Sequence, residues 1–147
     1  MFRMPRLWGF LRNEAVGFTH GVDEHLQLVK FLQDRSSVPE ELFRYVFTYW
    51  GGDQLRDNIE EVYTQNQLAF KEADVFLVEL CSLKRIFYGE WSLDLSRFGN
   101  WANWGLDAPS EEINSGAVES EILKDELYLK LDQLVALLGD RRVIFTG

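Results

Sequence analysis

The run from Asp74 to Lys84 constrains the fold of this chain more than any other part of its sequence. Between the charges at its two ends, the run DVFLVELCSLK is almost continuously apolar and about as long as one strand. A strand that is apolar on both faces is typical of the middle of a sheet covered by helices, as in parallel α/β proteins. A second run of this kind, from Arg142 to Gly147, follows a long helical pattern. Together the two runs predict an α/β fold.

Apolar residues recur at helical spacing through much of the remaining sequence. This spacing predicts four helices, which begin at Val22, run from Ser37 to Trp50, run from Asp53 to Ala73, and run from about Ala117 to Leu138. Ser37 and Pro39 form a start signal for the second helix. We therefore expect three α/β/α layers around a small, mostly parallel sheet. Residues 1–18 are irregular, and the segment after Lys84 is expected to be a loop with at most one short helix or strand.

A length of 147 residues predicts one α/β domain spanning residues 1–147. Two parallel strands do not make a stable sheet, because three or more strands are usually required. Three alternatives stay open at this point. Residues 1–18 and the tryptophan-rich segment supply further strands, another chain supplies them, or the sequence is a fragment of a larger domain.

Charge and composition exclude several classes of partner. The net charge is −9 and the isoelectric point is near 4.7, which argues against nucleic acid or an anionic membrane as the main partner. No stretch is apolar for long enough to span a bilayer, and the N-terminus lacks the apolar core of a signal peptide. The single cysteine, Cys81, lies inside the apolar run and fits a reducing compartment. We expect an acidic, cytoplasmic protein.

The first candidate catalytic residues lie near the end of the apolar run. Glu79 is the only charge within the run, and a partly desolvated carboxylate there suits acid–base chemistry. The alternative is a structural ion pair with Lys84 or Arg85. Ser82 follows the predicted strand as a nucleophile would, but the G-x-S-x-G pattern is absent. The alternative for Ser82 is a structural hydrogen bond to the backbone where the strand ends. The alternative for Cys81 is that it is a small apolar residue buried in the core.

The chain contains two histidines, His20 and His25. His20 immediately precedes a predicted helix, where it could face a cleft and form a polar cluster with Glu24. His25 is on the apolar side of that helix and is expected to be a packed core residue. The H-E-x-x-H and C-x-x-C patterns are absent, so neither a metal site nor a cofactor is expected.

Candidate binding residues are less well defined. Lys84 could neutralise an anionic group, and Trp101 and Trp104 could stack on a sugar or cover a partner surface. Packing in the core or in a lid is the alternative for these aromatic residues. The tryptophan-rich segment and an open sheet edge could instead form a non-catalytic interaction module that adds a partner chain or a second copy as a strand.

Three short patterns resemble SGNH/GDSL-like hydrolase-fold proteins associated with bacterial surface-polysaccharide biosynthesis. Thr19-His20 with Glu24 and Leu26-Gln27 is similar to a "TH…E.LQ" helix start in those proteins. The segment 37–42 (SVPEEL) resembles their "IPEEL" turn, and the segment 78–84 (VELCSLK) resembles their "VEISSxK" strand end. The resemblance covers roughly residues 17–85, and residues 134–147 suit the next helix–strand unit.

This resemblance implies a flavodoxin-like α/β/α fold and ester or acyl-group chemistry on a carbohydrate. It carries over no catalytic triad, because the Gly-Asp-Ser motif and the late Asp-x-x-His pair of those hydrolases are absent. The leading hypothesis is thus a carbohydrate-modifying, SGNH-like domain that lacks part of the catalytic machinery. In it, Glu79, His20 and Ser82 would be catalytic, while Lys84, Trp101 and Trp104 would bind a carbohydrate or acyl-ester substrate.

Overall fold

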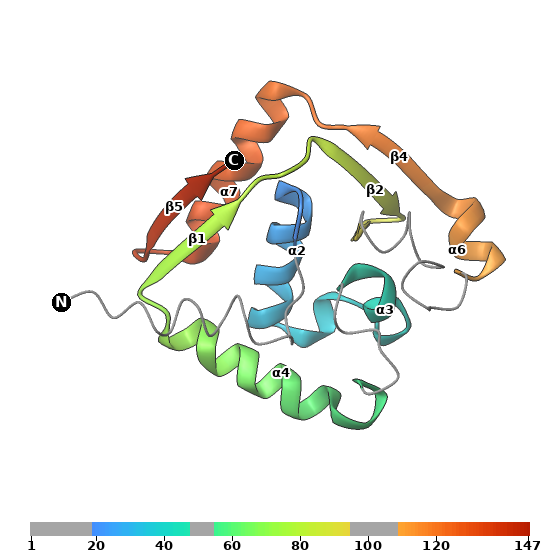
Figure 1. Ribbon diagram of the computed structural model, residues 1–147, viewed down its shortest axis with the longest axis horizontal. Coiled ribbons are helices and arrows are strands. Elements are labelled where there is room, and N and C mark those ends of the chain that lie inside the picture. Colours follow the sequence, from blue (N-terminus) through green and yellow to red (C-terminus); the bar gives the residue numbers. More distant parts are fainter. Residues whose placement is uncertain (1–18, 48–54, 95–108) are drawn as a thin grey trace.

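The structure, a computed structural model, describes residues 19–47, 55–94 and 109–147. Helices α2, α4 and α7 lie beside a two-stranded parallel sheet, and a three-stranded antiparallel sheet lies toward the other end of the molecule (Figure 1). The predicted α/β class is confirmed. No described helix is both long and apolar enough to cross a membrane.

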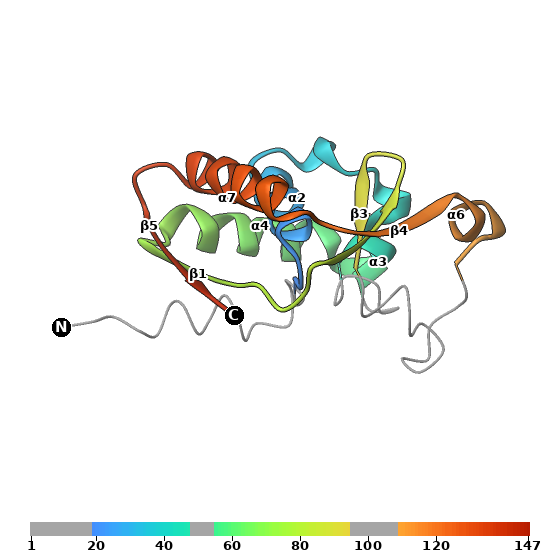
Figure 2. The ribbon, with the colours of Figure 1, turned by 90° about the horizontal axis from the view of Figure 1, so that it is seen from above.

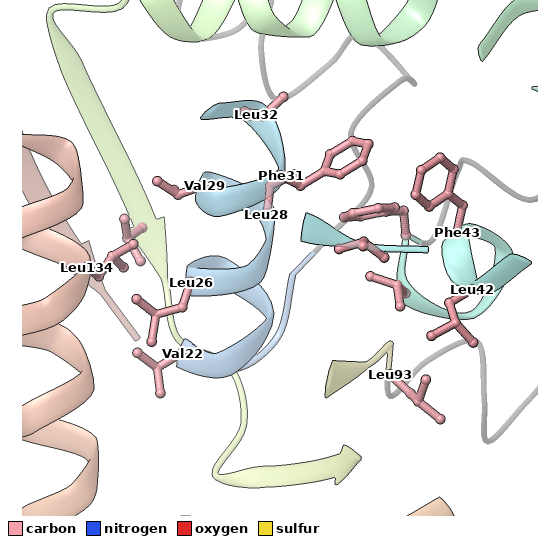
Figure 3. Close-up of a cluster of buried hydrophobic side chains, with 14 of the residues drawn as sticks. Val22, Leu26, Leu28, Val29, Phe31, Leu32, Leu42, Phe43, Leu93 and Leu134 are labelled. Atoms are coloured by element: carbon pink, nitrogen blue, oxygen red, sulfur yellow. The ribbon is translucent and has the colours of Figure 1, made fainter. Parts of the chain in front are cut away.

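Helix α2 (Val22–Gln33) is the centre of the packing. Its buried residues include Val22, Leu26, Leu28, Val29 and Leu32, as the helical spacing from Val22 predicts, and also Phe31 on the opposite side of the helix. Figure 3 shows Val22, Leu26 and Val29 on the side toward Leu134 of α7 (Lys124–Leu138), and Phe31 on the side toward Phe43. Phe31 is fully buried, and its ring centroid lies 5.0 Å from that of Phe43 and 5.2 Å from that of Tyr63 in α4 (Leu55–Glu72). One helix therefore joins two other helices into a single core.

The helix predicted after Ser37 is replaced by shorter pieces. These are the 3₁₀ turns η1 (Arg35–Ser37) and η2 (Glu40–Leu42), followed by α3 (Phe43–Val46). Val38 is extended, with φ −129° and ψ 127°, because the residue before a proline avoids helical geometry. The apolar residues Leu42, Phe43, Val46 and Phe47 of this segment are nevertheless all buried. Trp50 and the start signal at Asp53 lie outside the described residues.

The two apolar runs pair as parallel strands, as the sequence predicts. Strand β1 (Val75–Glu79) lies beside β5 (Arg142–Thr146), with Leu77 opposite Ile144. Figure 2 shows α2, α4 and α7 on one side of this pair. Leu77 and Ile144 point the other way and are 37% and 46% exposed, so in the described part of the chain no second helical layer covers them. The strand also ends at Glu79, earlier than the apolar run does.

The antiparallel sheet was not predicted. Strand β2 (Lys84–Tyr88) pairs with β3 (Trp91–Leu93) through a two-residue turn in which Gly89 has φ +60°, and on its other edge with β4 (Ala117–Glu121). The prediction of a helix from Ala117 is therefore wrong for residues 117–121, which form β4. Helix α6 (Glu111–Gly116) ends there, and the backbone of residues 117–121 bonds to β2 instead. Gly116 permits this contact, because a Cβ at that position would lie 2.8 Å from the Tyr88 ring.

A network of ion pairs joins α2, β2 and α7. The buried Asp23 carboxylate lies 2.6 Å from the Lys130 ammonium and 3.6 Å from the Arg85 guanidinium. Arg85 also donates two hydrogen bonds to Glu126, at 2.5 and 3.0 Å. Since a buried carboxylate without a cation is strongly unfavourable, these contacts fix how α7 and β2 approach the start of α2.

Truncation of the contact between α2 and α7 should show how much the core depends on it. Leu134 is 1% exposed and Leu129, on the same helix, is 59% exposed. We expect Leu134→Ala to lower the free energy of unfolding by about 2–5 kcal/mol, through lost burial and a cavity. Leu129→Ala is the matched control and should change it by less than about 0.5 kcal/mol. Equal effects in urea denaturation would contradict this packing.

Candidate functional site

Three titratable side chains meet at the start of α2. They are His20, just before the helix, Glu24 in its first turn, and Asp94, just after β3. One nitrogen or oxygen atom from each lies within 4.8 Å of the others. Glu24 is 4% exposed and Asp94 1% exposed, whereas the His20 side chain keeps 27% of its surface in solvent. The cluster thus has buried carboxylates and one imidazole that solvent can reach.

The start of α2 brings His20 and Glu24 together. Glu24 is the third residue of the helix, and its side chain turns back to the chain before the N-cap Gly21, much as in a capping box. Its Oε2 atom accepts a hydrogen bond from the His20 backbone N–H at 2.8 Å. The same oxygen lies 3.5 Å from His20 Nδ1. Glu24 therefore binds the backbone of His20 and lies beside its ring, whose Nδ1 makes no hydrogen bond to the described residues. The negative charge of Glu24 is favourable in the first turn of the helix.

Asp94 reaches the cluster through the docking of the β2–β3 hairpin on α2. The Gln27 side chain donates to the Ser92 carbonyl at 2.7 Å and accepts from the Ser92 N–H at 2.9 Å. The Asp94 N–H donates to the Tyr45 carbonyl at 2.8 Å. These backbone contacts, rather than local sequence, determine where the Asp94 carboxylate lies.

The cluster shifts the proton affinity of its members. The interaction with the Glu24 carboxylate raises the pKa of His20 above its ordinary value, although burial acts in the opposite direction. Burial raises the pKa of Glu24, its contact with His20 acts against this, and the charge of Asp94 adds to the increase. The His20 imidazole is accordingly a group that can accept and release a proton near neutral pH.

The same donors are of the types that bind divalent cations, namely one imidazole nitrogen and two carboxylates. Within the described ranges, no other group of three such residues comes this close together. The sequence patterns used to predict metal sites did not point to this cluster, because its members come from separate elements.

His25 has a structural role, as its apolar position suggests. Its Nδ1 donates to the Gly21 carbonyl at 2.8 Å, so in the neutral ring Nε2 accepts from the Thr19 hydroxyl at 2.9 Å. Burial lowers the pKa of His25 below its ordinary value. Both ring nitrogens are thus satisfied within the fold, and the neutral ring is favoured.

The loop after β1 lies against His20. The backbone N–H groups of Cys81 and Ser82 both donate to the His20 carbonyl, at 2.9 and 3.1 Å. The Ser82 hydroxyl accepts from the Lys84 N–H at 3.0 Å, which is the structural role named above as its alternative. Cys81 is exposed in this loop, so the expectation of a buried cysteine inside a core strand is wrong.

The other predicted site residues are spread more widely. Glu79 is exposed at the end of β1. Lys84 is 62% exposed and lies 3.9 Å from Glu119, while Arg85 binds Asp23 and Glu126, so the described ion pairs of these two cations do not include Glu79. Trp101 and Trp104 lie outside the described residues. Sequence reasoning missed Asp94, a lone acid in the apolar stretch WSLDL.

The two histidines should affect stability in different pH ranges. The folded pKa of His25 is lowered, so between that pKa and about 6.5 the unfolded chain binds more protons than the folded one. Acidification below pH 6.5 should therefore reduce the free energy of unfolding through His25. For His20 the raised pKa gives the opposite sign: its stabilisation is complete below pH 6.5 and is lost as the pH rises through the folded value.

His25→Gln should accordingly weaken the loss of stability below pH 6.5 and leave the range above it unchanged. Urea denaturation between pH 5 and pH 8 measures both ranges. An unaltered acid slope in this variant would show that His25 is not held neutral by the fold.

The comparisons with known proteins identify a family. Residues 8–102, more than half of the chain, match the model of the TviD N-terminal domain, and this range includes His20, Glu24 and Asp94. TviD is a protein of Vi antigen polysaccharide biosynthesis. The match supports the polysaccharide part of the resemblance described above and gives no support to its SGNH/GDSL hydrolase part. Curated proteins and solved structures yielded no significant match. The chain belongs to the TviD N-terminal domain family, which is associated with polysaccharide biosynthesis.

Proposed function

We propose that this chain acts on a carbohydrate in polysaccharide biosynthesis and that His20 carries the proton in ester or acyl-group chemistry. The supporting observation is the buried Glu24 carboxylate, which contacts the His20 ring at 3.5 Å and binds its backbone at 2.8 Å. A carboxylate that orients an imidazole and stabilises its charged form is a common arrangement in acyl-transfer and hydrolytic sites. The partly exposed His20 ring leaves a path to a substrate.

The chemical step needs one group that takes up and returns a proton. As a hydroxyl oxygen adds to the acyl carbonyl, His20 accepts the proton of that hydroxyl and a new C–O bond forms. When the tetrahedral intermediate collapses, the original ester C–O bond breaks and His20 returns the proton to the leaving oxygen. Glu24 stabilises the imidazolium between the two steps. The attacking hydroxyl would come from water, from a sugar or from Ser82, whose loop lies against the His20 carbonyl. If Ser82 attacks, the acyl group is transferred to its oxygen, and a second attack by water, with the same proton transfers through His20, releases the acid and restores the serine.

The remaining predicted residues belong to this proposal as well. Glu79, exposed at the end of β1, is a further candidate acid, and Lys84, Trp101 and Trp104 are candidates for substrate binding. An SGNH-like relationship rests on the resemblance of residues 17–85 alone, and the missing Gly-Asp-Ser serine means that any such site differs from the hydrolase pattern. No cofactor is part of the proposed step.

Release of acetate from a chemically O-acetylated polysaccharide tests the catalytic role of His20. We expect His20→Gln to reduce the rate by about 10²–10⁴-fold, the usual contribution of a general acid–base group. The wild-type rate should rise with pH through a pKa above the ordinary histidine value, because only neutral His20 accepts a proton. Full activity in a folded His20→Gln protein would exclude this role.

Paired carboxylate variants separate the role of Glu24, which contacts His20, from that of Glu79, which lies exposed at the end of β1. Glu24→Gln should reduce the rate and move the midpoint of the pH profile to lower pH, because it removes the contact that raises the His20 pKa. If Glu79 instead orients the substrate or the base, Glu79→Gln should reduce the rate without moving that midpoint. Ser82→Ala shows whether the serine is the attacking group, since only then is all turnover lost.

The second candidate function is a non-catalytic interaction module, and one observation favours it. The outer side of the β1–β5 pair carries Leu77 and Ile144, both partly exposed apolar residues at adjacent positions. A second copy or a partner chain could cover them or add to a sheet edge. If so, Leu77→Lys with Ile144→Lys should lower the mass measured by light scattering, whereas Leu129→Lys on α7 should not. A monomeric wild-type protein would exclude self-association.

A further inference from the structure

A groove with polar walls opens between α2, α7 and the β2–β3 hairpin. Its volume is about 180 Å³. One water molecule requires about 10–15 Å³ of such space, so the groove has room for on the order of ten waters, or for a small polar ring. We call it the hairpin groove and define it by Lys30 of α2, Ser37 of η1, Trp91 and Ser92 of β3, and Gln133 of α7.

Two buried hydroxyls at the groove lack a hydrogen-bond partner. They are the Oγ atoms of Ser92, which is 2% exposed, and of Ser37. A buried hydroxyl without a partner costs about 1–3 kcal/mol, so an unsatisfied group in a wall is an unusual feature that needs a physical reason. Both side chains line the groove, so rotation of each serine about χ1 toward the groove would let a ligand rich in hydroxyl groups satisfy these atoms.

The indole of Trp91 and the polar ends of three side chains complete the walls of the groove. The Trp91 N–H donates to the Ser37 carbonyl at 3.3 Å, which fixes the half-buried indole beside the groove. In the described part of the chain, the side chains of Lys30, Glu90 and Gln133 have no ion pair or hydrogen bond. Sugars bind in this way, with an apolar face on an aromatic ring and hydroxyls on amide and charged ends.

The charges of the groove favour a sugar over a phosphate. Asp23 and Lys130 neutralise one another at 2.6 Å, and Lys30 is balanced by Glu90, so the lining has no net charge. A phosphate site would present uncompensated cations or a cluster of backbone N–H groups.

We infer that the hairpin groove binds one sugar unit of the polysaccharide on which the domain acts. This inference rests on the proposed function and specifies where the substrate is held. Ser92 of the groove and Asp94 of the His20 cluster are two residues apart, which is about 7 Å along an extended chain. A polysaccharide seated in the groove would therefore bring a neighbouring part of the chain close to His20.

Binding of oligosaccharides from depolymerised Vi antigen, measured by calorimetry on the full chain, tests the groove. Lys30→Ala with Gln133→Ala should weaken binding at least tenfold, and Leu129→Ala on the outer side of α7 should not change it. Trp91→Phe keeps an aromatic ring and should bind more tightly than Trp91→Ala, provided that both show the wild-type circular dichroism. The exposed Lys30 and Gln133 keep the test valid if the Trp91→Ala protein does not fold.

The outcomes for the groove and for the acyl chemistry are separable. Loss of binding in the groove variants, with binding retained in His20→Gln, supports the groove whether or not acetate is released. Unchanged binding in the Lys30 and Gln133 double variant overturns the groove assignment, even if His20→Gln abolishes acetate release. Absence of binding by the wild-type protein also overturns the groove assignment.

Discussion

Two adjacent buried carboxylates at the start of α2 determine how the rest of the structure is arranged around them. Buried acids without partners cost several kcal/mol each, and successive residues on a helix point in directions about 100° apart. Asp23 and Glu24 must therefore find partners on different sides. Asp23 obtains Lys130 and Arg85, which draws α7 and β2 onto the helix. Glu24 obtains His20, and the pair that results is the centre of the candidate site.

The parts of the fold that the sequence predicted correctly are those with a strong local pattern. Helix α2 follows the spacing from Val22, and the strands β1 and β5 coincide with the two apolar runs. The antiparallel sheet depends on contacts between distant segments, and Ala117–Glu121 becomes a strand because β2 offers it a partner. One local signal was available: Gly89-Glu90 between two β-prone segments is typical of a tight hairpin turn.

The candidate site likewise has one part that local sequence predicts and another that depends on contacts between distant segments. Glu24 lies in the first turn of α2 and His20 just before its N-cap, so their proximity is local in the chain, and a polar cluster of the two was expected. Asp94 joins them only because Gln27 binds both backbone groups of Ser92 and so docks the hairpin on α2. No spacing rule connects positions so far apart in the sequence. The hairpin groove depends on that same docking, since one of its walls is the hairpin itself.

The central claim is that Glu24 holds His20 as a proton carrier, and the pKa of the His20 imidazole tests it most directly. A titration of the two histidine rings followed by NMR, in the wild-type protein and in Glu24→Gln, gives both values. We expect a His20 pKa above about 6.5 in the wild type and a lower one in the variant, while His25 stays below 6.5 in both. A His20 pKa that is unaffected by Glu24→Gln would contradict the account.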